Sequence, residues 1–483
     1  MAKRLDEAAR KHMPREGHLL QALAAIAGGD AVLTGESTVP YCKDWRGRYS
    51  GEALAVVFPS STAQVAKIVQ LCAANQISCV PQGGNTSLCG GSVPLADDSK
   101  QLVLNLSRMN CIRSVDATNY TMTVEAGCKL AALYEAAERM DRLFPLGLTA
   151  IAPHCEIGGN LSTNAGGIGV LRYGSARDLT LGLEVVLPDG RIWNGLRSLR
   201  KDNTGYDLKH LFIGAEGTLG IITAAVLKLY PRPKSMATAC VAVRNPAVAV
   251  ALLAHLRAAC GGKISAFEII SRSCLDLVFK HIPDTQEPFA AKHEWIVITQ
   301  LADVLQVPLD ETLRDALQSF GDGIIEFEAA SDKERAERWW KLRKNIPEAQ
   351  KIEGLSIKHD ISVPVGRVSE FISRTDGALR KAFTGVRIVA FGHMGDGNIH
   401  YNISMPSTEQ NRTFIEQQED AVNALVYEVV VRQLNGSISA EHGLWQLKRK
   451  TIRDYKDPLE LELMRNVKQA LDPKGLMNPG KVL

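Results

Sequence analysis

The stretch that decides the fold reads PQGGNTSLCGG, at residues 81–91, and follows a short apolar strand predicted at residues 77–80. Glycine has no Cβ atom, so successive backbone N–H groups can turn toward one point and form a concave site for an anion such as a pyrophosphate. Taken alone, one such cluster is more often a tight surface turn. Its meaning therefore depends on the rest of the chain.

Two further glycine clusters follow, EIGGNLSTNAGGIG at residues 156–169 and IGAEGTLGII at residues 213–222. Hydroxyl and amide side chains stand among these glycines, which suits a long polar ligand approached by bare backbone. Three clusters within about 140 residues weaken the interpretation as surface turns. The chain contains neither a complete G-x-G-x-x-G nor a G-x-x-x-x-G-K-[ST] motif, so a dinucleotide would be held by another fold.

The sequence around the clusters predicts two domains. An apolar run at 55–58, a helical pattern at 62–74 and the strand at 77–80 form a strand–helix–strand unit, which needs a parallel sheet to bury its helix. PRPKS, at residues 231–235, ends the region of glycine clusters, and we expect a domain boundary there. After it, strands alternate with longer helices, as in an α+β domain.

Composition narrows the class of function. The 483 residues carry 56 Lys+Arg against 53 Asp+Glu, a formal net charge of +3. This balance argues against nucleic-acid binding, which needs a concentrated positive field, and leaves room for a small anionic substrate. We find neither an apolar run of roughly 20 residues nor the apolar middle of a secretory signal, so the expected location is the cytoplasm, or the mitochondrial matrix in a eukaryote. The ten cysteines form no C-x-x-C pair, so no local iron–sulfur or zinc loop is expected.

A histidine and glutamate constellation lies near the C-terminus. VRIVAFGHMGDGNIHYNIS, at residues 386–404, is typical of a hairpin, and a turn centred near residues 396–397 would put His393 opposite His400. Opposed Cβ atoms lie roughly 4.5–5.5 Å apart, close enough for two imidazoles to hold one metal ion. Asn402 would share the face of His400. The segment SAEHG adds Glu441, and two histidines with one carboxylate form an open site for Zn²⁺ or another divalent ion. Each of these histidines alone is more often a core or turn residue.

The glycine clusters, together with PLG at 145–147 and RYG at 172–174, resemble the FAD domain of the vanillyl-alcohol oxidase type. The resemblance implies an α+β protein with a two-part FAD-binding domain of PCMH type and a C-terminal α+β substrate domain. The loop at 81–91 would lie at the pyrophosphate and the segment at 158–167 along the cofactor. The residues expected to bind FAD are Pro81, Gly83, Gly84, Asn85, Thr86, Ser87, Gly90, Gly91, Pro145, Gly158, Gly159, Ser162, Thr163, Asn164, Gly166, Gly167, Tyr173, Gly174, Glu216, Gly217, Gly220, Ile221, Ile222 and Asn478.

The resemblance also bears on how FAD is held and where the domains divide. Some members tether FAD through a histidine in the pyrophosphate loop, and the matching position here is Asn85, so we predict noncovalent FAD. Cys155 is an alternative tether, although a plain thiol is the simpler interpretation. The ending DPKGLMNPGKVL matches the family and is expected to fold back toward the flavin. The predicted parts are a helical lead-in (1–50), the FAD domain (51–232), the substrate and metal domain (233–455) and a returning C-terminal segment (456–483).

The patterns GH-x-GDGN-x-H and E-H-G resemble the D-2-hydroxyacid dehydrogenase branch of this family, which includes D-2-hydroxyglutarate and D-lactate dehydrogenases. The resemblance implies a metal on His393, His400 and Glu441, with His442 as the catalytic base. It also implies that Arg343, Lys358, Asn402 and His442 bind the substrate. One position departs from the pattern, because the hydroxyl residue expected four places after the arginine is Pro347 here.

The expected activity is an FAD-dependent dehydrogenase that oxidises a D-2-hydroxy acid, with D-2-hydroxyglutarate as the first choice, to the 2-oxo acid. An external electron-transfer flavoprotein or a quinone pathway would accept the electrons, and a homodimer is a further hypothesis. The alternatives within the fold are a D-lactate dehydrogenase and an oxygen-using alcohol oxidase. Outside this class, a metal-dependent hydrolase or lyase without flavin and a noncatalytic ligand-binding protein remain open.

Overall fold

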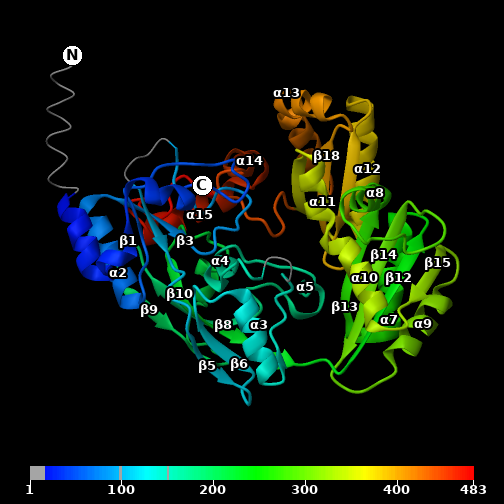
Figure 1. Ribbon diagram of the computed structural model, residues 1–483, viewed down its shortest axis with the longest axis horizontal. Coiled ribbons are helices and arrows are strands. Elements are labelled where there is room, and N and C mark those ends of the chain that lie inside the picture. The colour runs from blue at the N-terminus through cyan, green and yellow to red at the C-terminus, as the bar shows by residue number, and fades with distance from the viewer. Residues whose placement is uncertain (1–16, 97–100, 149–151) are drawn as a thin grey trace.

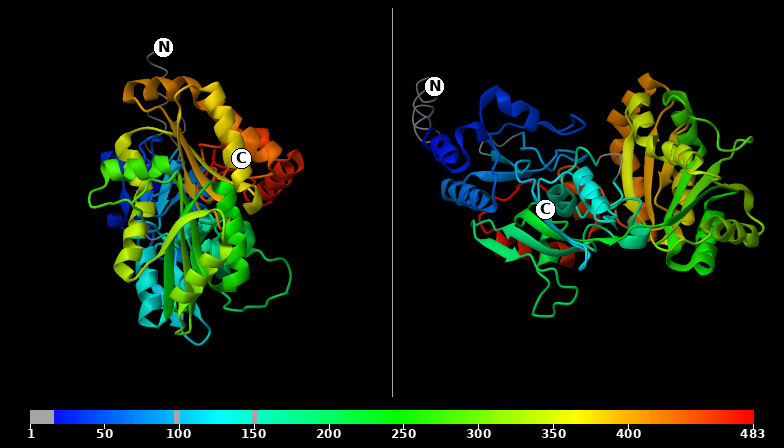
Figure 2. Two further views of the ribbon diagram at one scale, coloured as in Figure 1. Left: turned by 90° about the vertical axis from the view of Figure 1, so that its right-hand side faces the viewer. Right: turned by 60° about the horizontal axis from the view of Figure 1, so that its bottom comes forward.

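The computed structural model describes residues 17–96, 101–148 and 152–483. Two lobes stand side by side, one drawn from blue to green and the other from green to orange, and the red C-terminal segment returns to the first lobe (Figure 1). The right-hand view of Figure 2 shows the same two lobes separately from another direction. Each lobe has its own sheets and its own hydrophobic core.

The first lobe begins with a four-stranded sheet in the order β1-β2-β4-β3. β2 and β3 both run parallel to β4, and α2 connects β2 to β3. The predicted strand–helix–strand unit is confirmed, except that β4 lies between its two strands. The bounds are β1 Val32–Leu33, β2 Ala55–Val57, α2 Thr62–Asn75, β3 Ser78–Gln82 and β4 Gln101–Asn105.

A five-stranded antiparallel sheet in the order β5-β6-β10-β8-β9 completes this lobe. The second glycine cluster forms the short helix α4, which contributes Ile157 and Leu161 to the core, and the third cluster leads into β10. The bounds are β5 Ile112–Asp116, β6 Thr121–Glu125, α3 Leu130–Arg139, β7 Arg142–Leu143, α4 Ile157–Ser162, α5 Val170–Tyr173, β8 Thr180–Val186, β9 Ile192–Gly195, α6 Lys209–Phe212, β10 Ile221–Lys228 and β11 Tyr230–Pro231.

The second lobe is built on a seven-stranded sheet in the order β15-β12-β14-β13-β17-β18-β16, in which all neighbours are antiparallel. The hairpin predicted at 386–404 is formed by β17 and β18. The bounds are β12 Ser235–Val243, β13 Ile264–Ser271, β14 Trp295–Asp303, β15 Ile324–Ala329, β16 Ile357–Ser362, β17 Arg387–Gly392 and β18 Asn398–Ser404.

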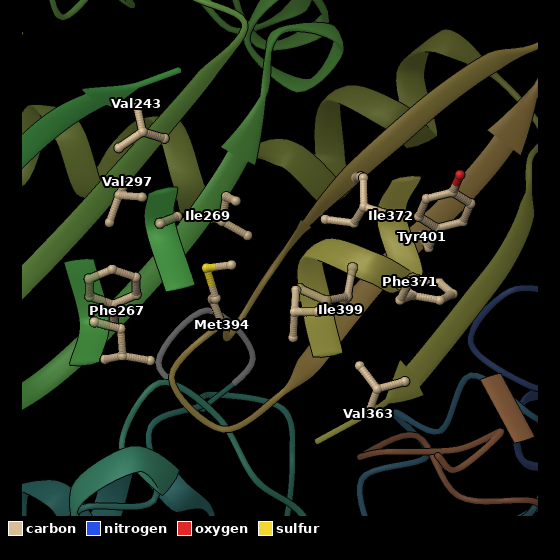
Figure 3. Close-up of a cluster of buried hydrophobic side chains, with 14 of the residues drawn as sticks. Val243, Phe267, Ile269, Val297, Val363, Phe371, Ile372, Met394, Ile399 and Tyr401 are labelled. Atoms are coloured by element: carbon tan, nitrogen blue, oxygen red, sulfur yellow. The ribbon is translucent and has the colours of Figure 1, made fainter. Parts of the chain in front are cut away.

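Helices cover both faces of this sheet. One face packs on α7 Pro246–Cys260, α9 Leu309–Phe320, α12 Val368–Ala382 and α13 Thr408–Tyr427, and the other on α8 Arg272–His281, α10 Lys333–Lys344 and α11 Ile346–Glu353. Successive strand residues point to opposite faces. Ile399 and Tyr401 of β18 therefore enter the core on the face covered by α7, α9, α12 and α13, which Figure 3 shows. His400 and Asn402 then lie on the other face.

The C-terminal segment packs on the first lobe. After α14 Arg449–Tyr455 and α15 Pro458–Leu471, Met477 pairs with Cys79 of β3, and the N–H of Asn478 donates to the Cys79 carbonyl at 2.8 Å. Met477 belongs to the same hydrophobic core as α2. Among the helices of the described residues, we find none with the length and apolarity needed to cross a membrane.

Candidate active site

Two adjacent rows of side chains cross β16, β18 and β17 on the face that packs on α10 and α11. In the first row, Asp360 pairs with His400 and His400 pairs with Phe391. In the next row, Lys358 pairs with Asn402. The rows are two residues apart along the strands, or about 6.6 Å. Asn402 and His400 therefore share one face, as the alternation predicts.

The structure brings His393 and His400 together by a different route from the one predicted. Phe391, not His393, lies opposite His400, so the predicted register is wrong by two residues. The reason is that β17 ends at Gly392 and a five-residue loop (393–397) follows, closed by turn hydrogen bonds to the His393 carbonyl, instead of a two-residue turn. The two imidazole rings still lie with their centroids 5.6 Å apart.

Met394 anchors this loop on the opposite face of the sheet. Its side chain is fully buried beside Phe267, Ile269 and Ile399 (Figure 3). A loop fixed by such a residue holds its neighbour His393 in place. Glu268 stands between Phe267 and Ile269 in the chain, so it points away from this core and toward His393.

Glu441 and His442 reach the site along the outer edge of β16. Ser437 bridges to Ser362 of β16, and the N–H of Ala440 donates to the Asp360 carbonyl at 3.2 Å. The Asp360 carboxylate then accepts the backbone N–H groups of Glu441 and His442, at 2.9 and 2.8 Å. Asp360 therefore fixes where both side chains begin.

A carboxylate surrounded by imidazoles results. Glu441 Oε1 lies 3.3 Å from His400 Nε2 and 3.9 Å from His442 Nε2, and Glu441 Oε2 lies 3.9 Å from His393 Nε2. Burial raises the pKa of Glu441 to about 8 and lowers that of His442 to about 4. Imidazole nitrogens and a carboxylate are donors that Zn²⁺ prefers, so these residues fit a divalent cation.

A group of four metal-type donors among the described residues differs from the predicted triad. Single ligand atoms of Asp360, His400, Glu441 and His442 all lie within 4.8 Å of one another, and His393 is outside this group. Asp360 is better placed to orient than to coordinate, because its Oδ2 accepts two backbone N–H groups and its Oδ1 accepts the side-chain N–H of Asn398 at 2.9 Å.

A second buried carboxylate, Glu268 of β13, touches two of the predicted site residues. It accepts a hydrogen bond from the ring of His393 and another from the guanidinium of Arg343, each at 2.7 Å. Burial alone would raise the pKa of Glu268, but the charges and hydrogen bonds of His393 and Arg343 lower it to about 2. No motif in the sequence predicted Glu268, although an acidic residue within the apolar strand ISAFEIIS is a usable signal.

The predicted substrate residues gather in the same place. The guanidinium of Arg343 lies over the Phe391 ring, 4.8 Å from its centroid. Burial, and next the charge of Arg46, lower the pKa of Lys358 to about 8. The side-chain N–H of Asn402 donates to Gln350 Oε1 at 2.9 Å.

Pro347 starts a helix where the resemblance leads us to expect a hydroxyl. It stands in the first turn of α11, where the missing N–H of proline is tolerated. Gln350, one turn later, is buried, and its side-chain nitrogen has no hydrogen-bond partner among the described residues. The donor that Pro347 cannot offer is thus present nearby, on a residue that the sequence analysis missed.

A cavity lies between the glycine clusters and the Glu441–His442 end of the imidazole group. Glu441, His442 and Trp445 line it at the imidazole end. The expected FAD residues that line it are Pro81, Gly83, Gly84, Asn85, Thr86, Ser87, Gly158, Gly159, Ser162, Thr163, Gly166, Glu216, Gly217, Gly220, Ile221 and Ile222. The glycine-rich loops and the acid–base residues therefore share one cavity.

The remaining expected FAD residues lie outside the lining, and two of them, Gly91 and Asn478, pack against residues that line it. The amide of Asn478 donates to the carbonyls of Gly91 and Glu216, at 3.2 and 2.9 Å, and a Cβ on Gly91 would lie 1.8 Å from the Trp445 ring. The carboxylate of Glu216 accepts the N–H of Trp445 at 2.8 Å. Those outside the lining are Gly90, Gly91, Pro145, Asn164, Gly167, Tyr173, Gly174 and Asn478.

The cavity wall fits FAD. A Cβ on Gly84 would lie 1.9 Å from the backbone oxygen of His154, so the loop can pack this closely only as glycine. Glu156 Oε2 and Asn160 Oδ1 line the cavity, are buried and have no hydrogen-bond partner among the described residues. Buried polar atoms without partners point to a polar ligand. Burial also raises the pKa of Glu156 to about 7.

Comparisons with known proteins agree on one family. Residues 53–195 match the family described as FAD binding domain, and residues 232–482 match FAD linked oxidases, C-terminal domain. The chain is 37% identical to the mitochondrial D-2-hydroxyglutarate dehydrogenase of Bos taurus over 475 residues, 96% of this chain and 83% of that protein. It is 35% identical to the D-2-hydroxyglutarate dehydrogenase of Xanthomonas citri pv. viticola over 447 residues, 92% of each.

Two further comparisons concern a yeast relative and the fold. The chain is 34% identical to the D-2-hydroxyglutarate–pyruvate transhydrogenase of Saccharomyces cerevisiae, over 95% of this chain and 93% of that protein. Among solved structures, 4-ethylphenol oxidase from Gulosibacter chungangensis superimposes with a TM-score of 0.74 at 19% identity, over 96% of both chains. At that identity the likeness shows the fold alone.

Proposed function

The chain belongs to the FAD-linked oxidases, in their D-2-hydroxyacid dehydrogenase branch, and we propose that its substrate is D-2-hydroxyglutarate, oxidised with the help of a divalent metal ion. It is an FAD-dependent oxidoreductase that acts on D-2-hydroxy acids. The observation that supports the proposal most is the single cavity whose wall holds both the glycine clusters and the pair Glu441–His442.

His393, His400 and Glu441 would hold the metal, which we propose to be zinc. The three side chains present two imidazole nitrogens within 4 Å of the carboxylate, and His393 is preferred to Asp360 because the Asp360 oxygens already accept hydrogen bonds. A bound divalent cation supplies positive charge beside the substrate hydroxyl and lowers the pKa of that group.

The acid–base work falls to His442. Burial lowers its pKa to about 4, so the imidazole is neutral near pH 7 and can accept the hydroxyl proton. Asp360 Oδ2 lies 3.6 Å from His442 Nδ1 and favours the imidazolium that forms when the proton arrives. FAD, when bound, supplies the two-electron acceptor.

Arg343, Lys358 and Asn402 would bind the carboxylates. The row that holds Lys358 and Asn402 lies about 6.6 Å from the row that holds His400, a separation that suits the two ends of a five-carbon diacid. The guanidinium of Arg343 can fork onto a carboxylate, and Lys358 adds a point charge. Lys358 is partly buried, where a bound anion would compensate its charge, and the buried Arg343 already pairs with Glu268 through Nε.

Further parts of the proposal concern the cofactor link and its surroundings. FAD is noncovalent, because Asn85 stands where some relatives carry a histidine, and Cys155 stays a plain buried thiol. The division at residue 232 is supported by β12, which begins the second large sheet just after that residue, and the divisions at residues 50 and 455 stay predictions. Location in the cytoplasm or mitochondrial matrix, and a homodimer, stay predictions.

The electrons would leave through an external acceptor, an electron-transfer flavoprotein or a quinone pathway. The name of the yeast relative, a transhydrogenase, adds pyruvate as a further acceptor to test. Steady-state turnover, measured separately with an artificial quinone, with pyruvate and with oxygen alone, shows which of these three acceptors reoxidises the flavin. Rapid turnover with oxygen and release of peroxide would favour the oxidase alternative instead.

Anaerobic bleaching of the bound flavin tests the substrate. We expect D-2-hydroxyglutarate to bleach the flavin and L-2-hydroxyglutarate to leave it oxidised. Removal of metal with a chelator should slow bleaching without releasing FAD, and added zinc should restore it. Bleaching at an unchanged rate after metal removal would contradict the metal assignment.

D-lactate oxidation is the second candidate, favoured by Pro347 in place of the expected hydroxyl. The same bleaching assay decides between the two substrates. Faster bleaching by D-lactate than by D-2-hydroxyglutarate at equal concentration would exchange their order.

A further inference from the structure

Glu268 joins two residues to which the proposed function gives different tasks. Its Oε1 accepts the Nδ1–H of His393 and its Oε2 accepts the Nε–H of Arg343, each at 2.7 Å. His393 is the proposed metal ligand, and Arg343 is the proposed carboxylate anchor. The Glu268 side chain is 2% exposed, so water competes little for either bond.

Strand register explains why this contact forms. β13 and β17 pair with Ile269 opposite Gly392, so the next residue outward on each side is Glu268 and His393. Arg343 reaches the same carboxylate from α10, on the helical layer over this face. Three elements far apart in the sequence therefore meet on one carboxylate.

Each of these two hydrogen bonds leaves free the nitrogen atoms of its partner that would bind the metal or the substrate. With Nδ1–H held by Glu268, Nε2 is the His393 nitrogen left to bind a metal ion, and it lies 3.9 Å from Glu441 Oε2. With Nε–H held, the terminal nitrogens of Arg343 remain available for a substrate carboxylate, and the Phe391 ring fixes the guanidinium plane from one side. Glu268 thus sets a ring tautomer and a guanidinium orientation at once.

We propose that Glu268 is a positioning residue that couples metal binding to binding of the substrate carboxylate. This inference rests on the proposed function, because it needs His393 on the metal and Arg343 on the substrate. Whichever ligand binds first fixes the shared carboxylate, and the second ligand then finds its own residue already placed. The coupling is therefore positive, and it acts in both directions.

A buried carboxylate between cations can also serve stability alone, and the chain offers a control of that kind. Glu353 pairs with Lys280 at 2.7 Å and with Arg387 at 2.6 Å, and neither partner belongs to the proposed site. Glu353→Gln weakens these partly buried ion pairs and the contact with His281 Nε2 at 2.6 Å, and it leaves the imidazoles of the proposed site untouched. Any effect that Glu268→Gln shares with Glu353→Gln is structural.

The test measures the zinc dissociation constant of the FAD-loaded protein at buffered free zinc, with and without 2-oxoglutarate. In the wild type we expect 2-oxoglutarate to tighten zinc binding about tenfold, within the usual range of coupling between sites. In Glu268→Gln, zinc should bind about 10- to 100-fold more weakly, and 2-oxoglutarate should tighten it by much less. Glu353→Gln should match the wild type in both respects, and FAD content should be equal in all three proteins.

If Glu268→Gln does not fold, Glu268→Asp is the second variant to test, because it keeps the negative charge. Its shorter side chain can reach only one of the two partners, so it should bind FAD normally and lose the effect of 2-oxoglutarate on zinc. Zinc binding that responds to 2-oxoglutarate as strongly in both variants as in the wild type overturns the coupling alone. A wild-type protein that holds FAD but no divalent metal overturns the metal assignment and the coupling with it.

Discussion

The cavity has two ends that are built in different ways. At the FAD end, where we propose that FAD binds, three glycine clusters supply backbone, and residues adjacent in the chain are adjacent in the wall. At the imidazole end, Glu441 and His442 line the cavity. The side chains that contact them come from β16, β18 and the loop after β17, and residues of β13 and α10 lie behind that loop. The first end is encoded locally by the absence of side chains. The second is encoded by strand alternation and register, which only the folded sheet brings together.

The largest expected effect comes from the imidazole end. His400→Ala removes a proposed metal ligand whose ring nitrogen lies 3.3 Å from Glu441, and we expect kcat to fall about 10³-fold with FAD content unchanged. Activity per bound flavin, zinc content and flavin absorbance measure the three parts separately. The matched control is His255→Ala, a histidine bonded to the Ala316 carbonyl on α9, which should leave all three unchanged. Loss of flavin with normal activity per flavin would refute the assignment.

At the FAD end we expect the opposite pattern, in which FAD binding is weakened and activity per bound flavin is kept. Gly84→Ala places a methyl group 1.9 Å from the His154 backbone oxygen, so the loop or its neighbour must shift. Overpacking of this kind costs about 1–3 kcal/mol, which weakens FAD binding up to about 100-fold if the whole cost falls on the FAD-bound state. Activity should be restored by added FAD. The control is Gly262→Ala, where a Cβ meets nothing within 4 Å, and equal FAD affinity in the two variants would contradict the prediction.

The same difference decides how much the sequence could predict. The α+β class with a PCMH-type FAD domain is confirmed, because glycine clusters and the strand–helix–strand pattern are local signals. The closeness of His393 and His400 was predicted, but through the wrong register. The loop after Gly392 is held by Met394 in a core to which β13 contributes Phe267 and Ile269, and no pattern within the hairpin predicts the contact with β13.

The residues that the sequence did not predict are those that hold or orient other residues of the site. Glu268 and Asp360 orient imidazoles, Gln350 holds Asn402, and Trp445 covers Gly91. Each contact joins elements that are not adjacent in the chain, so no motif contains it. An acidic residue inside an apolar strand is the usable signal for Glu268.

The pH dependence of substrate binding tests the role of Lys358 at the imidazole end. Burial and the charge of Arg46 lower its pKa to about 8, so the ammonium that attracts a carboxylate is present below that pH and is lost as pH rises through it. We expect KM for D-2-hydroxyglutarate to rise up to about tenfold per pH unit above the pKa that Lys358 has in the free enzyme. Lys358→Arg keeps its charge at high pH, so this rise should disappear. A rise of equal size in the arginine variant would assign the pH dependence to another group.

The smallest expected effect lies on the face of the sheet away from the cavity, and it tests whether that face is independent of the site. Gly377 is exposed within α12, and a Cβ there meets nothing within 4 Å. Gly377→Ala should raise the free energy of unfolding by about 0.5–1 kcal/mol, because alanine loses less backbone entropy in a helix. Gly261→Ala is the matched control, since its space is equally open but its φ of +59° is unfavourable for alanine and should lower stability. Denaturant unfolding measures both. Because neither glycine belongs to the rows that carry His400 and Lys358, kcat should stay at the wild-type value in both variants, and a change in kcat would show that α12 contributes to the geometry of the site.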